Sequence, residues 1–223
     1  MVSLSPTGLA VHGMLFVAAD VDAADDADYN QWYDREHVEE RVRVPGFLSG
    51  ARYQSLQGGR KYLGLYRTAA LDVFTSPAYR AAFGQQTPWS VTNLDRMRQP
   101  VRRVCAVEAV VGFGSGSRVV VLPLPLADDR AALVAQAHDA GRQLAALPGF
   151  VQSYLLVPDV ALSTPLPKEQ TEGRVLQPML VVETSHDAGS DAALASAADL
   201  LQADAAAAWR YALGWKLAAA DLA

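Results

Sequence analysis

Short apolar runs that favour β-strands alternate along the chain with longer segments in which apolar residues follow helical spacing. In the first half this pattern predicts strands over residues 9–19, 48–56, 61–68 and 101–113, with a hairpin turn at 57–60. Helices are predicted over 27–44 and from residue 71, with a second helix start at Ser76-Pro77 and a short helix ending near Met97. The resulting order, β-α-β-β-α-β, is that of a ferredoxin-like unit.

The second half of the chain shows the same order of elements. Strands are predicted over 118–126, 151–157 and 178–184, and helices over 128–147 and 191–207. Pro123 and Pro125 restrict the first of these strands to a sheet edge or shorten it. Segment 209–217 fits either a last strand or a continuation of the preceding helix.

One tripeptide occurs in both halves at the end of the first predicted helix. Pro45-Gly46-Phe47 returns 103 residues later as Pro148-Gly149-Phe150. Proline ends a helix and glycine permits an unusual turn, so the phenylalanine that follows is expected to anchor the next strand in a buried position. The repeat predicts a duplicated α+β chain with one ferredoxin-like unit in residues 1–113 and a second in 118–223, joined by a glycine-rich connector.

Composition and charge narrow the classes of partner. Half of the 223 residues are hydrophobic, the formal net charge is −5 and the pI is near 5.3, which argues against nucleic acid or an anionic membrane as the main partner. The single cysteine, Cys105, suits a reducing cytoplasm and is expected to be a buried thiol. The first apolar run lacks the basic start of a signal peptide, and the apolar runs are shorter than a membrane span. A cytoplasmic protein is therefore expected.

Residues 28–47 contain the densest cluster of aromatic, acidic and imidazole groups. At about 100° per residue, Tyr29, Tyr33 and His37 share one helical stripe, flanked by Glu40 and Arg41. A buried imidazole and two phenols need hydrogen-bond partners or a ligand. The cluster therefore indicates a small-molecule pocket, or core aromatics with His37 paired to Glu40, Arg41 or a backbone carbonyl.

The second predicted unit lacks these side chains. With the two tripeptides aligned, Ala140, Gln136 and Ala132 stand where the first unit has His37, Tyr33 and Tyr29. The second unit therefore keeps its helical pattern without an imidazole or a phenol at these positions, which favours a functional interpretation of the first cluster.

Four stretches of the first half resemble the dimeric α/β-barrel superfamily, in its EthD-like branch: WYDREHVEERVRVPGF, ARYQS, KYLGLY and SPAYRAAF. The resemblance implies that two ferredoxin-like units pair their antiparallel sheets into a barrel, here within one chain. Members of the superfamily include cofactor-free monooxygenases, isomerases, dehydratases and cyclases, and some members bind haem. We therefore expect no cofactor, with haem as the alternative, and no bound metal.

The first functional hypothesis is a cofactor-free enzyme acting on a small apolar or aromatic carbonyl compound. The predicted catalytic residues are His37 as general base and Tyr33 or Tyr66 as the group that polarises an oxygen. Arg41 or Arg52 could hold an anionic group, although solvent exposure is favoured for both. The full set of predicted substrate-binding residues is Tyr29, Trp32, Arg41, Arg52, Tyr53, Tyr62 and Trp89.

Two other hypotheses remain open at this point. One is a binding or structural barrel protein without catalysis, and the other is a haem protein. The long segment 158–177 is interpreted as either a lid or a mobile surface loop. The expected partner is a small-molecule ligand, with a homo-oligomer left open.

Overall fold

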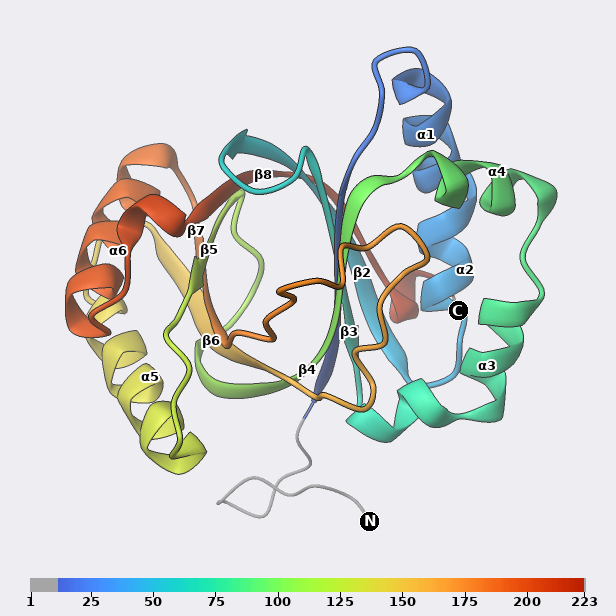
Figure 1. Cartoon of the computed structure of the whole chain (residues 1–223). Helices are drawn as coiled ribbons and strands as arrows, with labels where there is room; N and C mark the ends of the chain where they lie inside the picture. The colour runs from blue at the N-terminus through green and yellow to red at the C-terminus, as the bar shows by residue number, and fades with distance from the viewer. Residues whose placement is uncertain (1–11, 223) are drawn as a thin grey trace.

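The strands form one closed antiparallel barrel in the computed structural model, which describes residues 12–222. The strand order around the barrel is β1-β3-β2-β8-β5-β7-β6-β4 (Figure 1). The strands are β1 (Gly13–Asp20), β2 (Phe47–Gln57), β3 (Tyr62–Thr68), β4 (Arg98–Gly112), β5 (Arg118–Pro123), β6 (Phe150–Pro158), β7 (Met179–Thr184) and β8 (Trp209–Ala218). The predicted α+β barrel within one chain is confirmed.

Each half contributes a four-stranded sheet with ferredoxin-like order, β4-β1-β3-β2 and β8-β5-β7-β6. The sheets join where β2 pairs with β8 and β4 pairs with β6. The segment left open by the sequence, 209–217, is therefore a strand. Of the two alternatives for the first strand of the second half, the edge position is not found, because β5 lies between β7 and β8. Its early end at Pro123 agrees with the shortening expected from the prolines.

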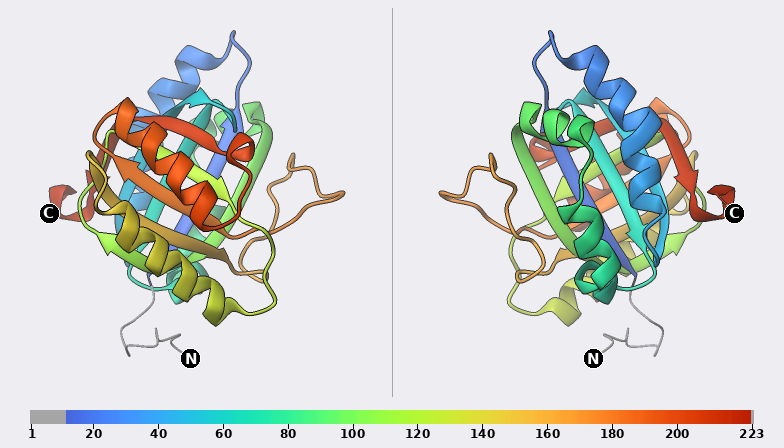
Figure 2. Two further views of the ribbon diagram at one scale, coloured as in Figure 1. Left: turned by 90° about the vertical axis from the view of Figure 1, so that its left-hand side faces the viewer. Right: turned by 90° about the vertical axis from the view of Figure 1, so that its right-hand side faces the viewer.

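Helices cover the barrel on two opposite sides (Figures 1 and 2). On the first half lie α1 (Asp26–Trp32), the π-helical η1 (Tyr33–His37), α2 (Val38–Val42), the 3₁₀ segment η2 (Leu71–Thr75), α3 (Pro77–Gly84) and α4 (Pro88–Arg96). On the second half lie α5 (Arg130–Leu144) and α6 (Asp187–Leu200), and η3 (Ala205–Ala207) and η4 (Ala219–Leu222) flank β8. None of the helices within residues 12–222 is long and apolar enough to cross a membrane.

Side-chain alternation along the strands separates three cores. On β1, Met14, Phe16 and Ala18 point into the barrel, whereas Leu15 packs against the helices of the first half. The core of the second half, between its sheet and α5 and α6, is built largely from valine, leucine and alanine. The predicted first strand began at residue 9, but residues 9–11 lie outside the described part of the chain.

The two proline-glycine turns have the same backbone geometry. Gly46 and Gly149 adopt φ values of 93° and 80°, which glycine accepts at little cost. The amide of Phe47 donates to the Val44 carbonyl over 3.0 Å, and that of Phe150 donates to Leu147 over 3.2 Å. The prediction of equal burial is wrong, because Phe47 is 3% exposed whereas Phe150 is only partly buried.

The long segment after β6 is fixed to β4. The Ser163 hydroxyl donates to the Val104 carbonyl and accepts from the Val104 amide, over 3.1 and 3.0 Å. The buried carboxylate of Glu169 accepts from the Arg102 amide and forms ion pairs with Arg103 and Arg174. In Figure 1 this segment passes in front of β4 towards α3 and α4, where it contributes one wall of a cavity.

We expect Phe47→Ala to lower the free energy of unfolding by about 3–5 kcal/mol, and Phe150→Ala to lower it by clearly less. The reason is that Phe47 packs against the rings of Phe74 and Tyr79, at centroid distances of 5.9 and 6.0 Å. Urea unfolding of both variants measures the difference. Equal losses would show that the turn, and not the burial of the ring, determines the contribution.

Candidate functional site

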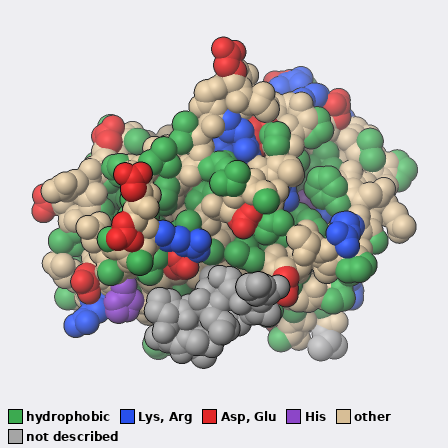
Figure 3. Space-filling model, turned by 60° about the horizontal axis from the view of Figure 1, so that its bottom comes forward, with side chains coloured by type: hydrophobic (Ala, Val, Ile, Leu, Met, Phe, Trp, Pro, Cys, Tyr) green, Lys and Arg blue, Asp and Glu red, His purple; other side chains and the backbone are tan. Residues whose placement is uncertain are grey.

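A cavity of about 330 Å³ lies between the outer face of the first sheet and the helices that cover it. Most of its lining is apolar: Leu15, Val17, Tyr79, Phe83, Val91, Leu94, Met97, Pro100, Leu166 and Pro167. The polar groups on its wall are Tyr33, His37, Arg41, Gln86, Asp95, Arg102 and Lys168. In Figure 3, histidine and basic side chains are visible between hydrophobic side chains on the face that is shown.

The first helix reaches the cavity through a π-helical turn. The amide of Val38 donates to the carbonyl of Tyr33, five residues back, where an α-helix would bond four residues back. The wider turn places Trp32, Tyr33 and His37 together against the sheet, and all three are buried. The prediction of one regular helix over 27–44 is therefore wrong at Tyr33–His37, where the helix is π-helical. A regular α-helix would place Trp32 away from the stripe that contains His37.

His37 has no hydrogen-bond partner within residues 12–222, and its Nδ1 atom is buried. The ring packs against Trp32 with centroids 4.3 Å apart and meets the edge of Tyr33 at 5.0 Å. Burial, with the charges of Arg41 and Arg52, holds the pKa of His37 well below 6.5. The imidazole is therefore neutral at pH 7, and the expected pairing with Glu40, Arg41 or a carbonyl is not present in the described residues.

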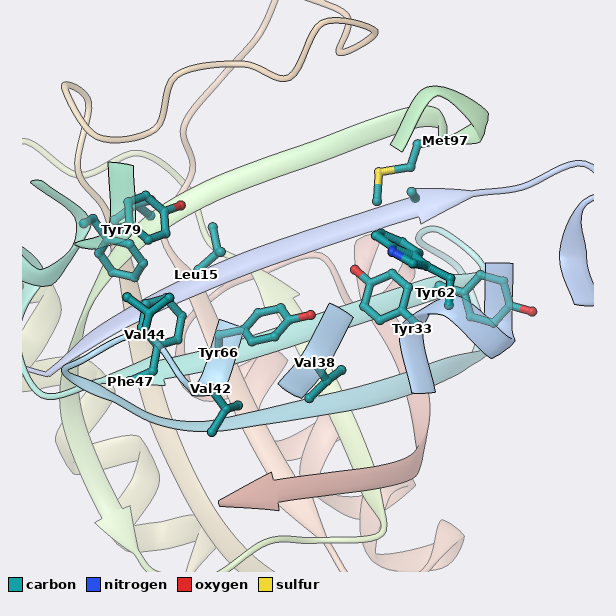
Figure 4. Packing of buried hydrophobic residues seen from close by; sticks show 14 of the residues in the cluster. Leu15, Tyr33, Val38, Val42, Val44, Phe47, Tyr62, Tyr66, Tyr79 and Met97 are labelled. Carbon is teal, nitrogen blue, oxygen red and sulfur yellow. The ribbon is translucent and has the colours of Figure 1, made fainter. Parts of the chain in front are cut away.

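Tyr33 and Tyr66 point their hydroxyl groups towards one another (Figure 4). Both hydroxyls lie over Gly64, where a Cβ atom would stand 3.5 Å from the Tyr33 oxygen and 3.6 Å from the Tyr66 oxygen. Burial raises the pKa of both phenols, so both stay protonated near neutral pH. Tyr33 lines the cavity, whereas Tyr66 lies outside the lining with its ring centroid 6.4 Å from that of His37.

Arg41 and Arg102 bring two buried guanidinium groups to the cavity. Arg41 is 4% exposed; one Nη donates to the Ala82 carbonyl over 2.9 Å, and Nε is buried without a partner in the described residues. The expected solvent exposure of Arg41 is therefore wrong. Arg102 was not predicted as a site residue, although strand alternation places it on the same face of β4 as the buried Val104.

Arg52 is also buried, but it lies outside the cavity lining. Its guanidinium pairs with Asp34 at 2.5 Å, donates to the Asn30 side chain over 3.0 Å and lies over the Tyr33 ring at 4.3 Å. Asp34 also accepts from Trp215 over 2.8 Å. Arg52 thus belongs to a network that connects β2, the first helix and β8, and it does not line the cavity. Its expected solvent exposure is wrong.

The other predicted substrate-binding residues do not line the cavity. Tyr29 and Trp32 are buried behind it, and the Trp32 indole donates to the Ser90 hydroxyl over 3.0 Å. The Tyr62 hydroxyl donates to Asp26 over 2.8 Å, and the Trp89 indole donates to Asp28 over 3.1 Å. Tyr53 points into the barrel interior. Of the predicted site residues, the structure therefore brings His37, Tyr33 and Arg41 together on the cavity.

No protein-family model and no curated protein matches this chain, but solved structures do. An anthrone oxidase-like protein superposes with a TM-score of 0.59 at 9% identity, covering 94% of this chain and 93% of its own. A monooxygenase-like protein from Listeria innocua gives 0.51 at 10% identity, covering 91% and 94%. A chlorite dismutase variant from Candidatus Nitrospira defluvii gives 0.52 at 12% identity, covering 92% and 91%. At these identities the matches show a shared fold and nothing beyond it.

Proposed function

We propose that this chain is an enzyme that removes an acidic C–H proton, at a carbon conjugated with the carbonyl, from a small, largely apolar aromatic ketone. The observation that carries the proposal is the neutral His37 imidazole, which has no protein partner in the described residues and lines a mostly apolar cavity. A buried polar group without a partner is costly, and such groups concentrate at functional sites.

In this mechanism His37 accepts the proton and Tyr33 donates a hydrogen bond to the developing enolate oxygen. A neutral imidazole is the basic form, and the low pKa keeps it in that form at neutral pH. The raised pKa of Tyr33 keeps its hydroxyl protonated, as a hydrogen-bond donor requires. Imidazolium next to Arg41 is unfavourable by itself, and the negative charge of the enolate offsets it.

The substrate class follows from the lining and from the names of the matched proteins. The apolar residues of the wall favour an apolar ligand, and a volume near 330 Å³ is at the lower end of the range for drug-sized ligands, about 300–1,000 Å³. One matched protein is anthrone oxidase-like and another monooxygenase-like, and anthrone is an aromatic ketone. We therefore assign anthrone-like ketones as the first substrates to test.

Haem does not fit this cavity, although one of the matched proteins is a chlorite dismutase variant. A porphyrin is larger than the ligands for which a cavity of about 330 Å³ is suited. The proposed chemistry therefore uses the side chains of the protein alone.

We also assign the two halves, residues 1–113 and 118–223, to a duplication in which the first copy keeps the site. The shared geometry of the Gly46 and Gly149 turns supports this assignment. In the alignment of the turns, Ala140 takes the place of His37 and is one of the buried residues of α5. An EthD-like origin of the first copy rests on the sequence resemblance of its motifs.

In D₂O, we expect the protein to accelerate exchange of the acidic C–H of anthrone or a related ketone, because His37 removes that proton. His37→Gln should slow the exchange by about 10²-fold or more, and Tyr33→Phe by about 10²-fold. Mass spectrometry of the recovered ketone measures the exchange. Tyr53→Phe is the matched control, since this hydroxyl lies in the barrel interior and should leave the rate unchanged.

The exchange assay also separates an enzyme from a binding protein. A ketone that binds without accelerated exchange in the wild type would replace the enzyme proposal with a binding function. Acceleration that persists in His37→Gln would reject His37 as the base while leaving an enzyme in place. Melting curves of each variant establish that it is folded.

The buried imidazole also predicts how stability depends on pH. Below about pH 6.5 the unfolded chain binds a proton at His37, whereas the folded chain, with its lowered pKa, does not. The free energy of unfolding should therefore fall as the pH falls below 6.5, by up to about 1.4 kcal/mol per pH unit from this group. Urea unfolding between pH 5 and 7.5 should show a shallower loss for His37→Gln; parallel curves would contradict a buried neutral imidazole.

A further inference from the structure

We infer that the ligand of this cavity carries a carboxylate, bound between the guanidinium groups of Arg41 and Arg102, which we call the guanidinium pair. This inference rests on the proposed function for the use of the cavity as a substrate site. It adds a substrate feature that the base and the apolar lining do not require: an acidic group at one end of an apolar molecule.

Arg41 has unused hydrogen-bonding capacity. Within residues 12–222, one Nη donates to the Ala82 carbonyl, Nε is buried without a partner, and no carboxylate lies within ion-pair distance of the guanidinium. Glu40 is adjacent in sequence, but its carboxylate accepts from the Ser90 hydroxyl over 3.4 Å. A buried cation that has only a neutral partner is costly unless an anion joins it.

Arg102, on β4, also has only neutral partners for its guanidinium group among the described residues. It is 6% exposed, and its guanidinium donates to the Leu162 carbonyl over 2.8 Å, to Thr164 and to the Tyr79 hydroxyl over 3.3 Å. All of these acceptors are neutral. The nearby carboxylate of Glu169 pairs instead with Arg103 and Arg174. It accepts a hydrogen bond from the backbone amide of Arg102, and not from the Arg102 guanidinium.

One helix holds both guanidinium groups. Arg41 bonds to Ala82 and Arg102 bonds to Tyr79, and these two residues of α3 are three positions apart, so they lie on one face of the helix. Both arginines line the same cavity although they come from α2 and β4. Two fixed guanidinium groups on one cavity suit a carboxylate, because each can donate two parallel N–H groups to it.

The remaining charges of the wall do not neutralise the guanidinium pair. Lys168 and Asp95 pair with each other at 2.7 Å, and His37 is neutral. The positive charge of Arg41 is also one cause of the low His37 pKa, as expected for a guanidinium that no anion compensates. The wall of the cavity therefore carries an excess of positive charge among mostly apolar residues.

The arrangement also orients the ligand. His37 precedes Arg41 by four residues, so the imidazole and the guanidinium are neighbours on the helix, with Cβ atoms roughly 5–6 Å apart. A carboxylate on the guanidinium pair thus places the adjoining apolar part of the ligand beside His37. An aromatic keto acid with its acidic carbon a few bonds from the carboxylate satisfies both groups.

Calorimetric titration with naphthalene-2-carboxylate and with its neutral isostere naphthalene-2-carboxamide tests the inference. The wild type should bind the carboxylate at least about tenfold more tightly. Arg41→Met and Arg102→Met should each abolish most of this preference. Arg80→Met is the matched control, because it removes a positive charge from the exposed face of α3 and should keep the preference. Equal affinity of the wild type for acid and amide would overturn the inference.

Two further measurements keep the outcome decisive. If an arginine variant does not fold, a pH titration of naphthalene-2-carboxylate labelled with ¹³C at the carboxyl group and bound to the wild type replaces it. The bound carboxylate should stay ionised below the pKa of the free acid. An unshifted titration would reject the guanidinium pair. His37→Gln should keep the preference for the acid while losing ketone exchange. A protein that prefers the acid but does not accelerate exchange would contradict the proposed function alone. A protein that accelerates exchange but binds acid and amide equally would contradict the anion site alone.

Discussion

Closure of the barrel is the constraint on which the rest of the molecule depends. Each half alone would leave two strand edges unpaired and one apolar sheet face exposed to water. Pairing of β2 with β8 and of β4 with β6 satisfies all four edges and buries the inner faces of both sheets in a common core. The outer face of each sheet then becomes a fixed surface on which its helices pack, and the cavity lies between one of these faces and its helices.

The packing on the outer face differs between the two sheets. On the second half, alanines such as Ala137, Ala140 and Ala197 let α5 and α6 lie close to the sheet over a dense aliphatic core. On the first half, a space remains between β1 and β4 and the elements that cover them. It is bounded by bulky aromatic side chains, by α3 and α4 and by the segment after β6. The same strand order therefore supports a filled layer on one side and a ligand-sized space on the other.

The strand order, the two Pro-Gly turns and the inward orientation of His37 could be predicted from local sequence, because alternation, helix-stop signals and helical spacing are local properties. The π-helical turn at Tyr33–His37 could not, since no residue type specifies a bond to the fifth residue back. The burial of Arg52 depends on Asp34 and Asn30 folding against β2, and that of Arg102 on a segment about 60 residues later. Such pairings between distant segments carry no signal in a single sequence.

The π-helical turn has a consequence for how such a site can arise. A turn that bonds to the fifth residue back contains one residue more than an α-helical turn, so it corresponds to a single-residue insertion in an ordinary helix. Removing one residue would return the helix to regular spacing and rotate Trp32 and Tyr33 relative to His37, with every strand of the barrel left unchanged. The placement of Trp32 and Tyr33 relative to His37 thus depends on the register of a single helical turn, and not on the strands of the barrel.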